Sequence, residues 1–139
     1  MFKFSSKSKE KLDQCHPKLR MLFNQVIQYH DCTIMEGIRS RELQDEYYRT
    51  GKSKLMWPHS KHNVVASNEL SRAVDVAPYI AGKGIPWNDV RYFYHFAGLV
   101  RGIAAELGIK VRSGLDWDND WRLDDQSFHD GPHFELLEG

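Results

Sequence analysis

One carboxylate inside an apolar segment constrains the fold more than any other feature of the sequence. Residues 73–77 have the composition of a short buried strand, which Pro78 ends, and Asp75 lies at its centre. A charged side chain is rarely placed in a buried strand unless it has an ionic partner or binds a metal. Asp75 is therefore either the partner of an arginine, for which Arg39 and Arg72 are candidates, or a metal ligand.

Two histidines favour the second interpretation. His62 lies in a polar loop before this strand, and His133 lies where a second apolar run begins near the C-terminus. Two imidazoles and a carboxylate form a common zinc-binding set in hydrolases, with the fourth position left to water. Asp130, three residues before His133 across a Gly-Pro turn, is the candidate general base, although an Asx turn would also explain it. Arg39 is the candidate for binding a substrate carboxylate and balancing developing charge.

Periodicity predicts an α+β fold in which two or three helices pack against a small antiparallel sheet, with the metal site at the concave face of the sheet. Helical spacing covers residues 6–30, with a break before Pro17, and a second helix runs from the cap Ser40 to about residue 50. The longest helix starts after Asn88 or Asp89 and ends before Gly108. Its expected buried stripe is Val90, Phe93, Tyr94, Ala97, Val100, Ala104 and Leu107. The expected strands cover residues 32–35, 73–77, 109–112 and 134–137.

The remaining features indicate a single domain, residues 1–139, which we expect to be a monomer. Lys+Arg and Asp+Glu are both 19, so the net charge of zero gives no general case for nucleic-acid binding. No segment is long and apolar enough for a signal peptide or a membrane span, so we expect synthesis in the cytoplasm and no membrane insertion. Cys15 and Cys32 have unrelated contexts and are expected to be free buried thiols rather than a disulfide.

Several motifs in this order resemble a known family. Ser60-x-His62, residues 73–75 and the run from Asp130 to Glu135 are similar to the zinc peptidases that include D-alanyl-D-alanine carboxypeptidases and the hedgehog signalling fold. Among these peptidases, the sequence resembles most the branch of L-alanyl-D-glutamate endopeptidases used as bacteriophage endolysins. Members of that branch carry a G-x-R-S…Q…G-x-S segment, to which residues 37–53 are similar. The similarity extends over residues 19–137.

The resemblance implies a zinc-dependent endolysin that hydrolyses the bond between L-alanine and D-glutamate in the peptide stem of peptidoglycan. It implies release to the cell wall through a separate membrane pore, a holin, and no separate wall-binding module. The implied zinc ligands are His62, Asp75 and His133. The implied general base is Asp130, and the implied substrate-binding residues are Arg39, Gln44 and Ser53.

The sequence departs from the family pattern between its first histidine and its aspartate. Relatives usually place these ligands much closer together with a glycine between them, whereas residues 63–74 separate them here and contain no glycine. We expect the additional residues to form a surface loop. The departure leaves His59 open as an alternative first ligand.

The acidic run Asp116, Asp118 and Asp120 resembles the start of a calcium loop. A regulatory Ca²⁺ ion is therefore a possibility. However, the glycine and the terminal glutamate that an EF-hand requires are absent at the right positions. We expect solvated acids there, and we assign no role to His129.

Three other functions stay open. A D-alanyl-D-alanine carboxypeptidase or dipeptidase is the nearest, although those relatives tend to carry glutamate where this chain has Asp130. A non-haem iron site uses the same ligand types, but usually takes its first histidine and its carboxylate almost adjacent on one strand. The third is a non-enzymatic wall-binding or structural phage protein on the same scaffold, which the complete set of ligand candidates disfavours.

Overall fold

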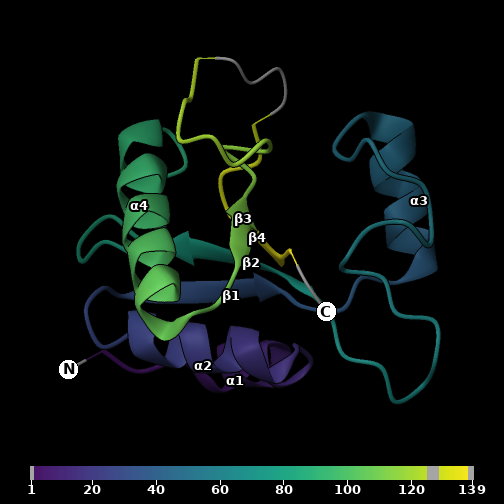
Figure 1. Cartoon of the computed structure of the whole chain (residues 1–139), viewed down its shortest axis with the longest axis horizontal. Coiled ribbons are helices and arrows are strands. Elements are labelled where there is room, and N and C mark those ends of the chain that lie inside the picture. The colour runs from purple at the N-terminus through teal and green to yellow at the C-terminus, as the bar shows by residue number, and fades with distance from the viewer. Residues whose placement is uncertain (1, 125–128, 138–139) are drawn as a thin grey trace.

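The centre of the molecule is a four-stranded antiparallel sheet with the strand order β1-β2-β4-β3 (Figure 1). The structure is a computed structural model that describes residues 2–124 and 129–137. The strands are β1 (Cys32–Glu36), β2 (Ala73–Pro78), β3 (Val111–Ser113) and β4 (His133–Leu136). The helices are α1 (Ser6–Asp13), α2 (Pro17–Val26), α3 (Arg41–Thr50) and α4 (Val90–Leu107). The predicted α+β class and antiparallel sheet are confirmed, with four helices in the described part of the chain instead of two or three.

Local signals account for the helix boundaries. Pro17 occupies the first turn of α2 and the side chain of His16 caps it, so the predicted break separates α1 from α2. Ser40 caps α3 by accepting a hydrogen bond from the backbone N–H of Leu43 at 3.1 Å. Gly51 ends α3 with φ 83°, a left-handed conformation that glycine adopts at little cost.

Helix α4 has the predicted boundaries, with Asp89 as its cap, but the predicted buried stripe is wrong at both ends. Val90 is 64% exposed and Leu107 is 37% exposed. Figure 1 shows the first turns of α4 extending beyond the sheet, and Leu107 borders a groove between α2 and α4. The face that is buried instead includes Phe96 and Arg101, which the predicted stripe did not contain.

Alternation along the strands separates the core from the site. Even-numbered residues of β2 and β4, such as Val74 and Phe134, are buried in the apolar core with the helices. The ring of Phe134 packs edge-on against Phe23 at 5.6 Å between centroids. Odd-numbered residues point to the opposite face, where Asp75 pairs directly with His133 across the strands. The sheet therefore brings two of the three predicted ligands together.

The segments around the sheet agree with most of the remaining predictions. Strand β3 is displaced toward the C-terminus relative to the predicted residues 109–112, and β4 begins one residue earlier than predicted, at His133. Residues 65–70 form an exposed loop, as expected for the long span between His62 and Asp75. Both cysteines are free and buried, as predicted. Within the described residues, no helix is long and apolar enough to cross a membrane.

Candidate metal centre and active site

Three predicted ligands converge on one point. His62 Nε2 lies 3.0 Å from Asp75 Oδ1, and His133 Nδ1 lies 3.3 Å from the same oxygen. The two imidazole nitrogens are 3.3 Å apart. His59, the alternative first ligand, is exposed on the wall of the adjacent pocket and is not part of this group.

The spacing of these atoms fits a tetrahedral metal ion. Zinc binds nitrogen and oxygen ligands at about 2.0–2.1 Å, which places tetrahedral ligands about 3.3 Å from one another. The three observed separations, 3.0 to 3.3 Å, match that value closely. Two imidazoles and one carboxylate also supply the three protein ligands typical of catalytic zinc sites that keep a water molecule.

Hydrogen bonds on the outer side orient both histidines. His62 Nδ1 donates to the carbonyl oxygen of Gly37 at 2.7 Å, and His133 Nε2 donates to Glu135 Oε1 at 2.8 Å. These partners accept a hydrogen bond from the outer nitrogen of each ring, so the inner nitrogen, which faces Asp75, is the one that can bind a metal once it carries no proton. The site is thus arranged for metal binding by the surrounding backbone and side chains.

Glu135 is itself held in place. It lies two residues after His133 on the same face of β4 and is 4% exposed. Arg112, its cross-strand neighbour on β3, donates to Glu135 at 2.7 Å, and the ammonium of Lys61 lies 3.5 Å away. The alternation of β4 places Glu135 beside His133, but the sequence does not reveal that the two side chains bond.

The charges of the site perturb one another. Burial opposes ionisation of Asp75, but the adjacent His62 and His133 outweigh it and hold the pKa of Asp75 far below its usual range. Burial also disfavours the charged form of His133, yet hydrogen bonds to Asp75 and Glu135 raise its pKa to about 9. Burial, followed by the negative charge of Asp75, raises the pKa of Asp130 to about 6. Asp130 thus has a pKa close to neutral, which suits a general base.

A tight turn places Asp130 beside the candidate metal centre. The backbone N–H of Asp130 donates to the carbonyl oxygen of Gly114 at 2.9 Å, and that of His133 donates to the carbonyl oxygen of Asp130 at 3.1 Å. A Cβ atom on Gly114 would lie only 2.2 Å from the carbonyl oxygen of Asp130, so a side chain at this position would displace the turn. Trp117 packs against His133 with 5.1 Å between ring centroids, a contact that sequence reasoning missed.

A pocket of about 510 Å³ opens onto this centre. It lies between residues 52–55 and 59–61, which follow α3, and side chains from β3, β4 and the segment that joins them. Asp130 and His133 both line it. The pocket therefore gives a bound peptide access to the candidate metal site and to the candidate base.

The three predicted substrate-binding residues occupy different positions. Arg39 lines the pocket, donates to Glu36 at 2.6 Å and to Gln44 at 3.0 Å, and lies 3.7 Å from Asp75. Gln44 is 0% exposed and lies beneath the pocket, where its amide nitrogen donates to Ser53 Oγ at 3.0 Å. Ser53 lines the pocket. Gln44 thus connects Arg39 to Ser53 and does not reach the pocket itself.

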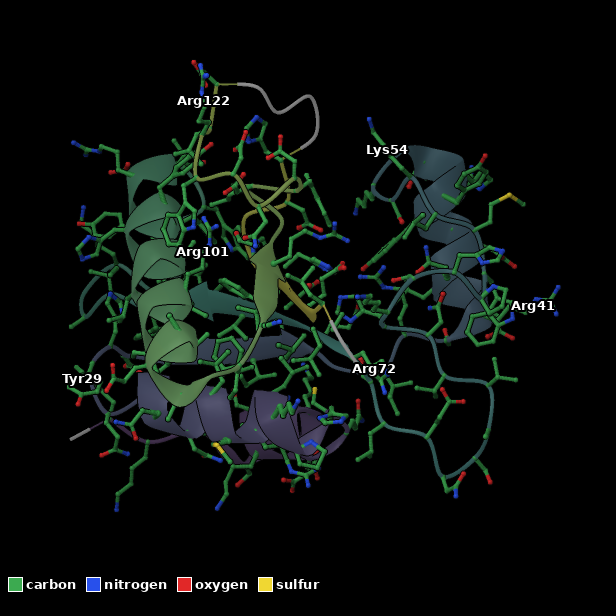
Figure 2. All side chains as sticks on the ribbon, viewed as in Figure 1. Tyr29, Arg41, Lys54, Arg72, Arg101 and Arg122 are labelled. Atoms are coloured by element: carbon green, nitrogen blue, oxygen red, sulfur yellow. The ribbon has the colours of Figure 1, made fainter. Side chains whose placement is uncertain are left out.

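The acidic loop after β3 differs from the expected solvated acids. Asp116 is buried and forms an ion pair of 3.0 Å with Arg101, which reaches across from α4 (Figure 2). The guanidinium of Arg101 also stacks on Trp121 at 3.4 Å from the ring centroid. The carboxylates of Asp116, Asp118 and Asp120 lie within 4.8 Å of one another. The expectation is therefore wrong for Asp116, because Arg101 compensates its buried charge.

Comparisons with known proteins agree with the motifs. The sequence profile of the phage L-alanyl-D-glutamate peptidase family matches residues 1–137. The L-alanyl-D-glutamate peptidase of Escherichia phage T5 is 32% identical over an alignment of 141 positions, which covers 98% of each chain. The crystal structure of the Serratia marcescens L-Ala D-Glu endopeptidase ChiX aligns with a TM-score of 0.74 and 31% identity, covering 98% of this chain and 90% of that one. This chain belongs to the phage L-alanyl-D-glutamate peptidase family, as the order of its motifs predicted.

Proposed function

We propose that the protein is a zinc-dependent endolysin that hydrolyses the L-alanyl-D-glutamate bond in the peptide stem of peptidoglycan. Family membership supports the bond that is cleaved. The observation that carries the chemistry is the convergence of His62, Asp75 and His133 beside Asp130. We assign the first three residues as zinc ligands and Asp130 as the general base.

Each protein group has a defined task in this proposal. Zinc bound by these residues would lower the pKa of a bound water to about 7 and would act as a Lewis acid on the peptide carbonyl. The carboxylate of Asp130 accepts the proton of the attacking water and delivers it to the leaving amine of the D-glutamyl residue. Gly37 and Glu135 keep the ligating imidazole nitrogens aimed at the site.

Arg39 acts near the reacting atoms through its charge. Its guanidinium lies between Glu36 and Asp75, at 2.6 Å and 3.7 Å respectively, and stacks over the ring of Tyr47. In this position it balances the carboxylates of the site and borders the pocket. We propose that Arg39 and Ser53 contact the peptide, whereas Gln44 supports both of them from below.

The cellular setting follows from the proposed substrate. We propose that the protein acts as a monomer on the cell wall after release through a separate membrane pore. We propose no calcium ion in the Asp116–Asp120 loop, since Arg101 already provides a cationic partner for Asp116.

Two variants separate metal binding from proton transfer. We expect His133→Ala to lose both bound zinc and peptidoglycan hydrolysis, and Asp130→Ala to keep zinc but lose turnover. Zinc content is measured on the purified proteins, and hydrolysis is measured by the amino groups released from isolated peptidoglycan. Hydrolysis at the wild-type rate by Asp130→Ala would refute the assigned base.

A further inference from the structure

The pocket carries more positive than negative charge. Among the described residues that line it, five are lysine or arginine and three are aspartate or glutamate. Three of the cations are buried or half-buried: Arg39 binds Glu36 and Gln44, and both Arg112 and Lys61 bind Glu135. These three hold the site together. The exposed cations of the lining are Lys52 and Lys54, which belong to the segment that follows α3; the ammonium of Lys52 also lies over the ring of Tyr47, 5.5 Å from its centroid.

That segment is anchored from below. Gln44 Nε2 donates to Ser53 Oγ at 3.0 Å and to the carbonyl oxygen of Leu55 at 2.6 Å. The backbone N–H of Ser53 donates to the carbonyl oxygen of Tyr47 at 3.1 Å. Lys52 and Lys54 flank Ser53 in the sequence, so these bonds fix the backbone that presents both lysines. Figure 2 shows Lys54 on the side of α3 that faces β3 and β4.

Arg39 is poorly placed to bind a substrate carboxylate in bidentate fashion. Its Nε and Nη1 donate to Glu36 and Gln44, its Nη2 lies 3.7 Å from Asp75, and its side chain is 6% exposed. Bidentate binding requires two parallel N–H groups on one edge of the guanidinium. A lysine ammonium has no such requirement and reaches a carboxylate on a flexible stem.

The proposed substrate carries a free carboxylate that a cation in the pocket can bind. A D-glutamyl residue has two carboxyl groups, and a linear peptide continues through only one of them. The other stays free on the residue that directly follows the scissile bond, as a carboxylate or, where it has been amidated, as a neutral carboxamide. An enzyme that cleaves at this residue therefore meets a negative charge close to the metal centre.

We propose that Lys52 and Lys54 form a subsite that binds the free carboxylate of the D-glutamyl residue. This inference rests on the proposed function and adds a specificity to it: the enzyme prefers peptides with the free acid over the same peptides with a carboxamide. Gln44 and Ser53 position this subsite by fixing the backbone between the two lysines.

The test uses two synthetic peptides that differ only in this group, one with a D-glutamyl carboxylate and one with the carboxamide. We measure kcat/KM on both for the wild-type protein, for the double variant Lys52→Gln/Lys54→Gln, and for Lys18→Gln. Lys18 is an exposed lysine on α2, away from the pocket. The carboxamide peptide is an internal check on folding, because its cleavage does not depend on the proposed ion pair.

We expect the wild-type protein and Lys18→Gln to cleave the acid peptide about fivefold more efficiently than the carboxamide. In the double variant, kcat/KM should fall for the acid peptide alone, mainly through KM, and the preference should approach one. Added salt should reduce the preference of the wild-type protein as well.

An equal acid-to-carboxamide ratio in the wild type and the double variant would overturn the subsite and leave the proposed function intact. Failure of the zinc-loaded wild type to cleave either peptide would instead overturn the proposed function, and the subsite with it. Charge reversal by the double variant Lys52→Glu/Lys54→Glu gives an independent check, because it should invert the preference in favour of the carboxamide.

Discussion

Replacing Glu135 by glutamine should weaken zinc binding by about 10- to 100-fold, the usual effect of removing a group that orients a metal-ligating histidine. The carboxylate accepts hydrogen bonds from His133 at 2.8 Å and from Arg112 at 2.7 Å. Glutamine has nearly the same shape but only one acceptor oxygen and no charge. Glutamine therefore cannot accept in the same way from both His133 and Arg112, and it cannot balance the charges of Arg112 and Lys61.

The same variant should lower the free energy of unfolding. Burial opposes ionisation of Glu135, but the hydrogen bonds and charges of His133 and Arg112 outweigh it and lower the pKa of Glu135 from 4.5 to about 2. A shift of this size corresponds to about 3 kcal/mol of stability in the metal-free protein. Because the folded-state pKa is depressed, this contribution is present above the unfolded pKa and is lost as the pH falls from about 4.5 to 2.

Two measurements check these effects. Competition with a chromophoric chelator at neutral pH measures zinc affinity, and urea unfolding of the metal-free proteins between pH 2 and 7 measures stability. Glu46→Gln is the matched control, since Glu46 is exposed on α3 and pairs only with the exposed Arg49 among the described residues. Zinc affinity equal to that of the wild type in folded Glu135→Gln would refute the idea that Glu135 orients His133.

Three further changes probe other parts of the structure. Gly114→Ala should abolish hydrolysis, because a Cβ atom would displace the turn before β4, whereas Gly98→Ala on α4 meets no atom within 4 Å and should keep full activity. Arg101→Met should cost about 3 kcal/mol in urea unfolding by leaving a buried carboxylate unpaired, whereas Arg122→Met at an exposed ion pair should change little. Zinc affinity should rise about tenfold per pH unit up to about pH 9, because the metal must displace a proton from His133; a flat profile in a chelator titration would contradict this.

Short-range rules were sufficient for much of the fold. The caps Ser40 and Asp89 and the terminal Gly51 mark helix ends through bonds and backbone angles that involve only a few neighbouring residues. The unusual carboxylate in strand β2 was also visible in the sequence, because burying a charge requires a partner. Asp75 has that partner in two histidines, which the motif order identified.

The features that sequence reasoning missed are contacts between elements that are far apart in the sequence. Asp116 and Asp118 look alike in the sequence, yet Arg101 from α4 buries the first of them while the second stays exposed. The packing of Trp117 on His133 likewise depends on how the loop after β3 folds back over β4. Neither contact produces a local periodicity, so neither could be read before the elements were placed in space.

The bond that is cleaved is the most direct test of the central claim. Mass spectrometry of isolated peptidoglycan digested by the zinc-loaded protein measures it in a single experiment. We predict fragments with a new N-terminal D-glutamyl residue and a new C-terminal L-alanine, formed with zinc and lost after chelation. Release of free D-alanine without a new D-glutamyl N-terminus would contradict the account and identify a carboxypeptidase instead.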